Sequence, residues 1–340
     1  MHPNPECMQG DNCLTKWGSM TVPTPLRTTC RTVNFKLEFD PSSMIVRYYS
    51  VDAMKSRLNV TQVGRMLYFL GDGKMLIGIT SDRSMQFCVI SRQSQSTAHV
   101  YEQLILSMKI SHGVDLIEEK LGASCDCLER AILFSLKCEL VRGGGWMNIG
   151  KGMELFTTSD ILNKPALEGT RNVHVVKVSQ GRSMSVDVEF AVYKYYPINS
   201  SLAKQGIEGS RVYVLPNLVE AVVGEPICEV TDGSVAFLKG YWLANHGVTI
   251  PGECLHDQVR ITFPGSSMQL TYPLVCVWRF MWSFLPNQTV DCQQTISSTF
   301  ESALAKIVGT WKKYVIPDLK IGRPCDFKNE VTSSKRNKQA

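Results

Sequence analysis

The sequence predicts an α+β fold, with largely antiparallel sheets and packed helices arranged in two lobes. Three observations predict it: strand segments with a two-residue hydrophobic period, turn residues between them, and longer segments with helical periodicity. All three occur together in residues 258–315, which predict a β-hairpin, then an aromatic run marked by proline, then one amphipathic helix. This stretch indicates a core-building module rather than a catalytic centre.

The hairpin is predicted from two alternating segments on either side of a turn. Apolar residues occupy every second position in both segments: Val259, Ile261 and Phe263, then Met268, Leu270 and Tyr272. Residues 264–267, Pro-Gly-Ser-Ser, favour a turn because proline presets φ and glycine tolerates a positive φ. The short connection makes antiparallel pairing the expected arrangement.

The long helix is predicted from Asp291 to a stop at Pro317. Asp291 is the expected N-cap, and Gln294, three residues on, completes a capping-box-like pair. One side of this helix is apolar and carries Ile296, Phe300, Ala303, Leu304, Ile307, Val308, Trp311 and Val315. We expect this side to pack on a sheet; the alternative is a face that binds a partner.

Several segments carry a resemblance to a known family. The family's order is matched by residues 212–216 (VYVLP), 247–254 (GVTIPGEC), 270–276 (LTYPLVC) and 323–325 (RPC). On these segments the chain resembles the uncharacterised chromosome 18 open reading frame 63 protein family, which has a domain of unknown function. The resemblance covers residues 205–327, and it departs from the family at Trp278, where a less bulky residue is expected. It implies no known activity and carries over no catalytic residues.

The remaining elements are predicted from hydrophobic periodicity and turn residues. Strands are expected at residues 33–39, 44–49, 75–80, 86–91, 173–178, 185–195 and 211–215. Helices are expected at residues 98–110, 114–121 and 237–245. Residues 128–141 fit either a helix or a strand and end at three glycines, residues 143–145.

The expected domain organisation is two α+β lobes between irregular ends. Residues 1–26 contain several prolines and no periodicity, so they are expected to be disordered. The lobes are expected at residues 27–165 and 170–327, the second matching the resembled family, with a boundary in the polar connection at residues 159–171. Residues 328–340 are expected to form a basic tail.

Composition indicates a globular intracellular protein. The 340 residues are 44% hydrophobic and 20% charged, and the net charge of +5 permits anionic partners without requiring them. No basic region followed by an apolar core opens the sequence, so the twelve cysteines are expected as thiols in the nucleus or cytoplasm. The most apolar run, residues 273–286, is too short to span a bilayer and contains Arg279, so no membrane association is expected.

Two groups of histidine and cysteine are candidate metal ligands. The first group is His246, Cys254 and His256, with Cys228 or Cys276 as a further thiolate for zinc. The second group, Cys125, Cys127 and Cys138, lacks the paired spacing of structural zinc sites. The alternative for both groups is thiols packed as small hydrophobic residues, and a loop histidine.

No catalytic residue, cofactor-binding residue or cofactor is predicted. Residues 71–74 (GDGK) resemble a phosphate loop, but Tyr68 replaces its earlier glycine and Met75 replaces its hydroxyl. An Asp-Gly hairpin turn is expected there instead. No Gly-x-Ser-x-Gly motif occurs, and the adjacent Glu118 and Glu119 would point to different sides of a helix.

Three basic features keep nucleic-acid binding as an alternative. Lys335, Arg336 and Lys338 in the tail are candidate interaction residues for phosphate or for nuclear import; the alternative is a solubilising end. Cations also adjoin aromatic rings at residues 47–49 (RYY) and 194–196 (KYY), as they do on surfaces that stack bases. Packing within a strand explains these two pairs equally well.

The expected function is a non-enzymatic protein-interaction module or scaffold that presents an edge strand or a groove to a protein partner. One alternative is a single-stranded nucleic-acid-binding protein. The other is a metal- or thiol-dependent enzyme centred on residues 246–256. We favour the interaction module because patterns of buried faces are abundant and catalytic spacing is absent, while a fold alone does not assign chemistry.

Overall fold

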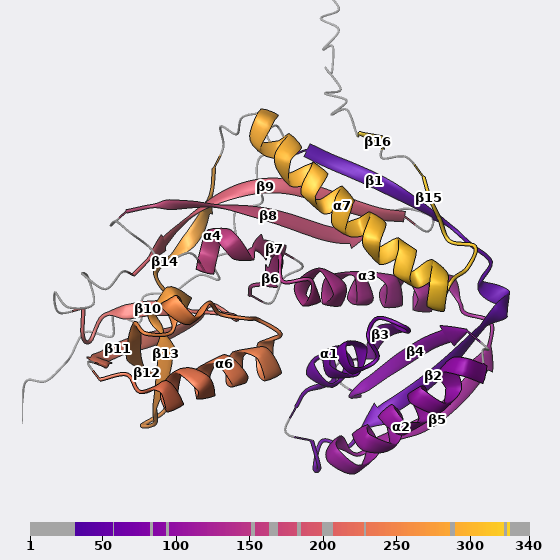
Figure 1. Ribbon diagram of the computed structural model, residues 1–340, viewed down its shortest axis with the longest axis horizontal. Coiled ribbons are helices and arrows are strands. Elements are labelled where there is room, and N and C mark those ends of the chain that lie inside the picture. The colour runs from indigo at the N-terminus through magenta and orange to yellow at the C-terminus, as the bar shows by residue number, and fades with distance from the viewer. Residues whose placement is uncertain are drawn as a thin grey trace, which may run out of the picture.

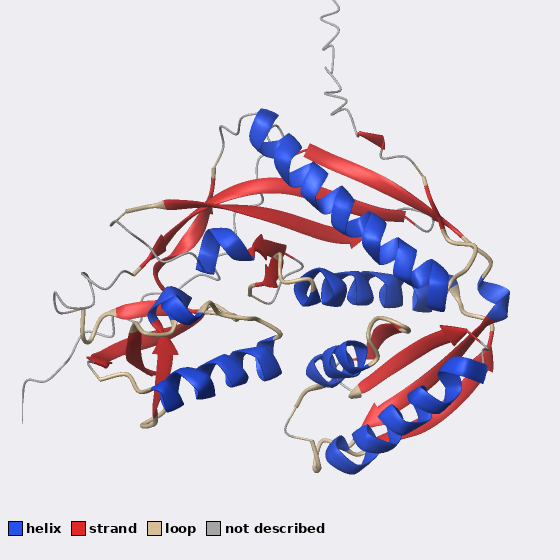
Figure 2. Ribbon diagram, viewed as in Figure 1, coloured by secondary structure: helices blue, strands red, loops and turns tan. Residues whose placement is uncertain are grey.

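The computed structural model arranges the chain in two antiparallel sheets with six α-helices among the residues it describes (Figures 1 and 2). The described residues are 31–56, 58–81, 84–92, 95–150, 154–162, 169–181, 185–198, 207–227, 229–285, 290–322 and 325–326. Within them, the predicted α+β class, with antiparallel sheets and packed helices, is confirmed. No described helix is long and apolar enough to cross a membrane.

The smaller sheet has four strands in the order β3-β4-β2-β5. Their bounds are Leu76–Ser81 (β3), Gln86–Arg92 (β4), Met44–Val51 (β2) and Val114–Leu121 (β5). One face packs against α1 (Val60–Leu70) and α2 (Gln95–His112), and the other face packs against α3 (Cys125–Arg142). Alternating side chains of β3 and β4 are therefore buried on both faces.

The larger sheet runs in the order β13-β12-β11-β10-β14-β9-β8-β7-β6. The bounds are Gln269–Pro273 (β13), Gln258–Thr262 (β12), Val219–Ile227 (β11), Arg211–Val214 (β10), Val277–Phe284 (β14), Ser185–Pro197 (β9), Arg171–Gln180 (β8), Glu154–Thr157 (β7) and Trp146–Asn148 (β6). One edge of β9 pairs with β8, and the other edge pairs first with β1 (Arg31–Glu38) and then with β14. β15 (Lys320–Ile321) and β16 (Cys325–Asp326) pair with β1.

Helices α3 and α7 (Val290–Tyr314) pack on the larger sheet, and Figure 1 shows α3 between the two sheets. Phe300 of α7 contacts the rings of Phe35 in β1 and Phe190 in β9. The shorter helices are α4 (Thr158–Leu162) and α6 (Asp232–His246), with 3-10 turns at Pro41–Ser43, Gly252–Cys254 and Leu274–Cys276. The main apolar core thus lies where both sheets meet α3 and α7.

The strongest sequence patterns are confirmed. β12 and β13 form the predicted antiparallel hairpin, with Val259 opposite Tyr272. α7 begins one residue before the predicted cap Asp291, and its apolar face is buried at Ile296, Phe300, Leu304, Ile307, Val308, Trp311 and Val315. α6 contains the predicted helix at residues 237–245, capped by Thr231 and by Gly247 at a φ of 70°.

Helix α3 joins the two sheets by lying along the outer edge of β3. The Ser135 hydroxyl accepts a hydrogen bond from the Ile77 N–H (2.8 Å) and donates one to the Ile77 carbonyl (3.3 Å). Gly78 permits this approach, because a Cβ there would lie 3.0 Å from the backbone nitrogen of Ala131. Arg130 adds a hydrogen bond from Nη1 to the Thr80 carbonyl (3.2 Å). α3 therefore satisfies backbone groups that an edge strand otherwise leaves unpaired.

Two element predictions are wrong. Residues 114–121 were expected to be helical but form β5, because pairing with β2 along the strand outweighs local helical preference. Residues 71–74 were expected to form a hairpin turn but connect α1 to β3, with Gly71 as the C-cap of α1. The ambiguous residues 128–141 belong to α3, which ends at Gly143.

The boundary expected at residues 159–171 lies between β7 and β8, which are hydrogen-bonded neighbours in the larger sheet. β1, from the expected first lobe, pairs with β9 of the expected second lobe. Backbone hydrogen bonds therefore connect the two expected lobes, and their division into separate domains stays a prediction. The expected disordered residues 1–26 and basic tail 328–340 lie outside the described residues.

Ser135→Ala should lower the free energy of unfolding by about 1–3 kcal/mol, because the buried N–H of Ile77 loses its hydrogen-bond acceptor. Urea unfolding followed by circular dichroism measures the change. Ser302→Ala, on the exposed side of α7, is the matched control and should shift the free energy by less than about 0.5 kcal/mol. Equal unfolding midpoints for the two variants would contradict the role given to Ser135.

Candidate functional site

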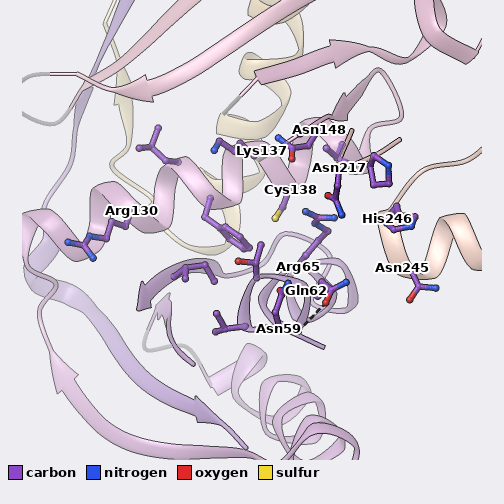
Figure 3. A pocket seen from close by; sticks show the side chains of 18 of the residues that line it. Asn59, Gln62, Arg65, Arg130, Lys137, Cys138, Asn148, Asn217, Asn245 and His246 are labelled. Carbon is purple, nitrogen blue, oxygen red and sulfur yellow. Dashed lines mark hydrogen bonds between the residues drawn. The ribbon is translucent and has the colours of Figure 1, made fainter. Parts of the chain in front are cut away.

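A cleft with a volume of about 1000 Å³ opens between α1, α3 and the C-terminal end of α6. The turns after β6 and β10 and the end of β8 complete its walls. Its polar side chains are Asn59, Thr61, Gln62, Arg65, Thr80, Arg130, Lys137, Asn148, Ser179, Gln180, Asn217, Asn245 and His246. Figure 3 shows Arg65, Asn217 and His246 towards the end where α1 faces α6, and Arg130 at the opposite end, on α3.

Three cationic side chains line the cleft. Arg65 comes from α1 and is half-buried, and no hydrogen bond or ion pair joins it to another residue in the described part of the chain. Arg130 and Lys137 come from α3, two turns apart. Arg130 is exposed and pairs with Asp126 (2.9 Å). The packing of α1 against α3 therefore brings the positive charges of Arg65 and Lys137 near each other, while Asp126 compensates that of Arg130.

Burial makes the Lys137 ammonium more acidic than an ordinary lysine. Desolvation lowers the pKa of Lys137 to about 8, and the charge of Arg65 acts in the same direction, while Cys138 and Glu154 oppose it. The ammonium is still charged at neutral pH, but it is poorly solvated. An anion in the cleft would stabilise this charge and that of Arg65 together.

The remaining polar lining consists mainly of amides and hydroxyls. Asn59 and Gln62 form the capping box of α1. The Asn148 side chain donates to the Glu154 carbonyl (3.1 Å) and Asn245 donates to the Tyr241 carbonyl (3.0 Å). The buried Thr80 hydroxyl has no hydrogen-bond partner among the described residues. Among the described lining residues none is a carboxylate, so the cleft offers donors and positive charge to a ligand.

His246 and Cys138 are both uncharged in the cleft. Burial, and then the charge of Arg65, lowers the pKa of His246 to about 4. The imidazole packs against Trp242, with ring centroids 4.9 Å apart. Burial raises the pKa of the Cys138 thiol to about 12. Neither group is tuned to act as a proton acceptor or as a thiolate nucleophile near neutral pH.

The described residues do not form the predicted metal site: Cys228 lies outside them, and Cys254 and Cys276 are buried neighbours without a third ligand. His246 lines the cleft, His256 is exposed, and the buried Cys254 thiol donates a hydrogen bond to the Leu162 carbonyl (2.7 Å). Across the described ranges, no three histidine, cysteine, aspartate or glutamate side chains gather closely enough to hold a metal ion. In the second group, Cys125 is exposed, whereas Cys127 and Cys138 are buried. Among the described residues, the structure therefore does not bring reactive groups together around residues 246–256, so it does not support the enzyme alternative centred there.

One tyrosine of each cation–aromatic segment is buried. Tyr49 stacks on Phe87, with ring centroids 5.4 Å apart, and Tyr195 packs against Trp278, at 4.7 Å, so these two rings are unavailable to stack bases. The other two rings are half-buried: Lys120 lies over the ring of Tyr48 (5.6 Å), and Tyr196 contacts Phe280 edge-on (5.3 Å). The tail candidates Lys335, Arg336 and Lys338 lie outside the described residues.

Sequence reasoning missed Arg65 and Lys137. Arg65 belongs to α1, which was not predicted, although the Asn59 and Gln62 capping box is a readable start signal for that helix. Lys137 was obscured because residues 128–141 fitted either a helix or a strand. Only the packing of α1 against α3 brings both cations to one cleft, and no local pattern reports that contact.

Comparison with known proteins identifies no family. No protein-family model matches the chain, and no curated protein matches it. Similar solved structures include Marinitoga piezophila Argonaute in complex with 5′ OH guide RNA (TM-score 0.36, 8% identity, covering 88% of this chain and 40% of that one). They also include A. aeolicus Argonaute, with a TM-score of 0.39 and 8% identity over 86% of this chain and 43% of that one. A third is Clostridium butyricum Argonaute bound to a guide DNA and a 19-mer target DNA, with a TM-score of 0.38 and 11% identity over 86% of this chain and 44% of that one. The chain spans less than half of these proteins, and likeness at such low scores supports no functional argument.

The folded protein should lose stability as pH falls from the unfolded pKa of His246 towards its lower folded value of about 4. In this window the unfolded state binds the extra proton, and the loss is about 2 kcal/mol at about pH 5. His246→Gln should remove most of this slope, measured as urea unfolding at several pH values. His256→Gln, on the exposed surface, is the control. A slope that His246→Gln leaves intact would contradict the burial argument.

Proposed function

We propose that the chain is a non-enzymatic binding protein whose cleft takes a segment of single-stranded nucleic acid. One observation carries the proposal: the charges of Arg65 and Lys137 act on each other in a cleft whose described lining contains no carboxylate, and Arg130 adds a third cation at the opposite end (Figure 3). A phosphate group suits these cations because it is anionic, and because arginine donates two parallel hydrogen bonds to its oxygens. The half-buried Arg65 contributes most, since its charge has no partner among the described residues.

The size and lining of the cleft favour a single strand over a duplex. A volume of about 1000 Å³ holds a few nucleotides, whereas a duplex is read by elements that project into its grooves. Phe134 and His246 line the cleft with ring surfaces, and rings of this kind stack unpaired bases. The amides of Asn148, Asn217 and Asn245 offer hydrogen bonds to base edges.

Two of the titratable groups in the cleft give little support to catalysis. The Cys138 thiol stays protonated, and the pKa of His246, about 4, leaves it a weak base. General acid–base catalysis works best with a pKa near the operating pH, and Lys137, with a pKa of about 8, is the described lining residue that meets this condition. No second group tuned to neutral pH accompanies it among the described lining residues, so binding without turnover is the function that we propose.

A second candidate function is recognition of a protein partner at an edge strand, as the sequence patterns suggested, and we assign that strand to β5, whose residues were expected to be helical. β5 ends the smaller sheet, so its outer edge carries backbone groups that no other described strand pairs with. Leu116, Ile117 and Leu121 of β5 are each more than half exposed. An extended peptide can add to such an edge as a further strand.

Arg65→Gln should weaken binding of a fluorescent single-stranded oligonucleotide about tenfold, because one buried charge-assisted contact to phosphate is lost. The slope of log affinity against log salt concentration should also fall in magnitude by about 1, because the variant makes one phosphate contact fewer. Fluorescence anisotropy at several salt concentrations measures both quantities. Lys306→Gln makes the same charge change on the exposed side of α7 and is the matched control.

Competition separates the possible ligands of the cleft. Unlabelled single strands should displace the probe at lower concentration than duplex DNA or heparin does. Absence of binding at low salt, or equal weakening by Arg65→Gln and Lys306→Gln, would refute the proposal. Stronger competition by heparin than by single strands would show a general polyanion site instead.

For the β5 candidate, Ile117→Lys should reduce capture of partner proteins at least severalfold, because a charge replaces an apolar contact at the edge. Quantitative affinity purification of the wild type and the variant measures the loss. For any partner recovered, hydrogen exchange should show slower exchange of the β5 amides in the complex. Protection confined to other elements would exclude β5 as the docking strand.

A further inference from the structure

Two buried thiols lie side by side outside the cleft. The sulfur atoms of Cys88 in β4 and Cys127 in the first turn of α3 are 3.3 Å apart. Cys88 is fully buried and Cys127 is 6% exposed. Their positions are 39 residues apart in the chain, so the contact exists only because α3 packs on the smaller sheet.

The surroundings of Cys127 favour its thiolate. Ser124 caps α3, and its side chain accepts a hydrogen bond from the backbone N–H of Cys127 (3.3 Å), which places Cys127 in the positive first turn. A hydrogen bond from the Cys88 thiol, opposed by burial and helped by the Tyr48 hydroxyl, lowers the pKa of Cys127 to about 7. The pKa of Cys88 is raised by the same hydrogen bond and by burial. The pair thus has one nucleophilic sulfur and one protonated neighbour.

We propose that Cys88 and Cys127 form a reversible redox pair that hydrogen peroxide oxidises to a disulfide. In the first step the Cys127 thiolate attacks one peroxide oxygen and breaks the O–O bond, giving a sulfenic acid and hydroxide. In the second step the Cys88 sulfur attacks the Cys127 sulfur, its proton leaves with the departing hydroxyl, and water is released. Overall, two thiols and one peroxide give one disulfide and two waters.

The burial of the pair selects its oxidant. With Cys127 only 6% exposed, a molecule the size of peroxide fits the approach better than a tripeptide disulfide does. Cys88 is also confined, because a Cβ on the neighbouring Gly78 would lie 3.0 Å from its sulfur. Cys125, two residues before Cys127, is exposed and is the competing target for larger oxidants.

Peptide mapping of the full-length protein tests this inference directly. The Cys125→Ser variant leaves Cys127 as the single thiol in the tryptic peptide of residues 121–130, and Cys88 is the single thiol in that of residues 84–92. The folded, reduced variant is treated with equimolar peroxide, its remaining thiols are alkylated, and it is digested without reductant. We expect the two peptides to be linked, and dithiothreitol to release them.

Two comparisons distinguish a prepared pair from random oxidation. Linkage should be at least tenfold slower in urea, where the two sulfurs are no longer held together, and Tyr48→Phe should slow it severalfold in the folded state. Oxidation should also raise the urea midpoint, because the new bond constrains the unfolded chain. Recovery of both peptides as separate alkylated species, or equal rates in folded and unfolded protein, would overturn the inference.

Discussion

The docking of α3 on the outer edge of β3 is the contact on which the rest of the structure depends. Ser135 satisfies both backbone groups of Ile77, and the missing side chain of Gly78 lets the helix backbone come close enough to do so. With this edge covered, the smaller sheet is joined to the larger one through the other sides of α3. The same docking sets Lys137 beside the cleft and Cys127 beside Cys88.

Burial also sets the chemistry of the groups that α3 brings together. Desolvation lowers the pKa values of Lys137 and His246 and raises that of Cys138. The charged form of Lys137 is therefore poorly stabilised in the cleft, while His246 and Cys138 are neutral. Such a site has more to gain from an incoming anion than an exposed basic surface has. The net charge of the whole chain, +5, does not indicate where on the protein an anion would bind.

The elements that were correctly predicted are those whose buried face can be identified from the hydrophobic period of their own residues. β12 and β13 alternate cleanly, and α7 repeats apolar residues at helical spacing, so both were predictable. β5 was not, because only Val114 of its eight residues is buried and its strand form comes from pairing with β2. The cleft was not predictable either, since Arg65, Lys137 and His246 come from three helices whose mutual packing no short segment encodes.

The pairing of β9 has a consequence for biosynthesis. Asn34 of β1 bonds to Asp187 of β9, 153 residues later in the chain. During translation β1 therefore leaves the ribosome long before its hydrogen-bonding partner exists, while the strands of the smaller sheet follow it closely. The smaller sheet can therefore assemble first, while one apolar face of β1, with Val33, Phe35 and Leu37, stays without its partner strand until β9 is made.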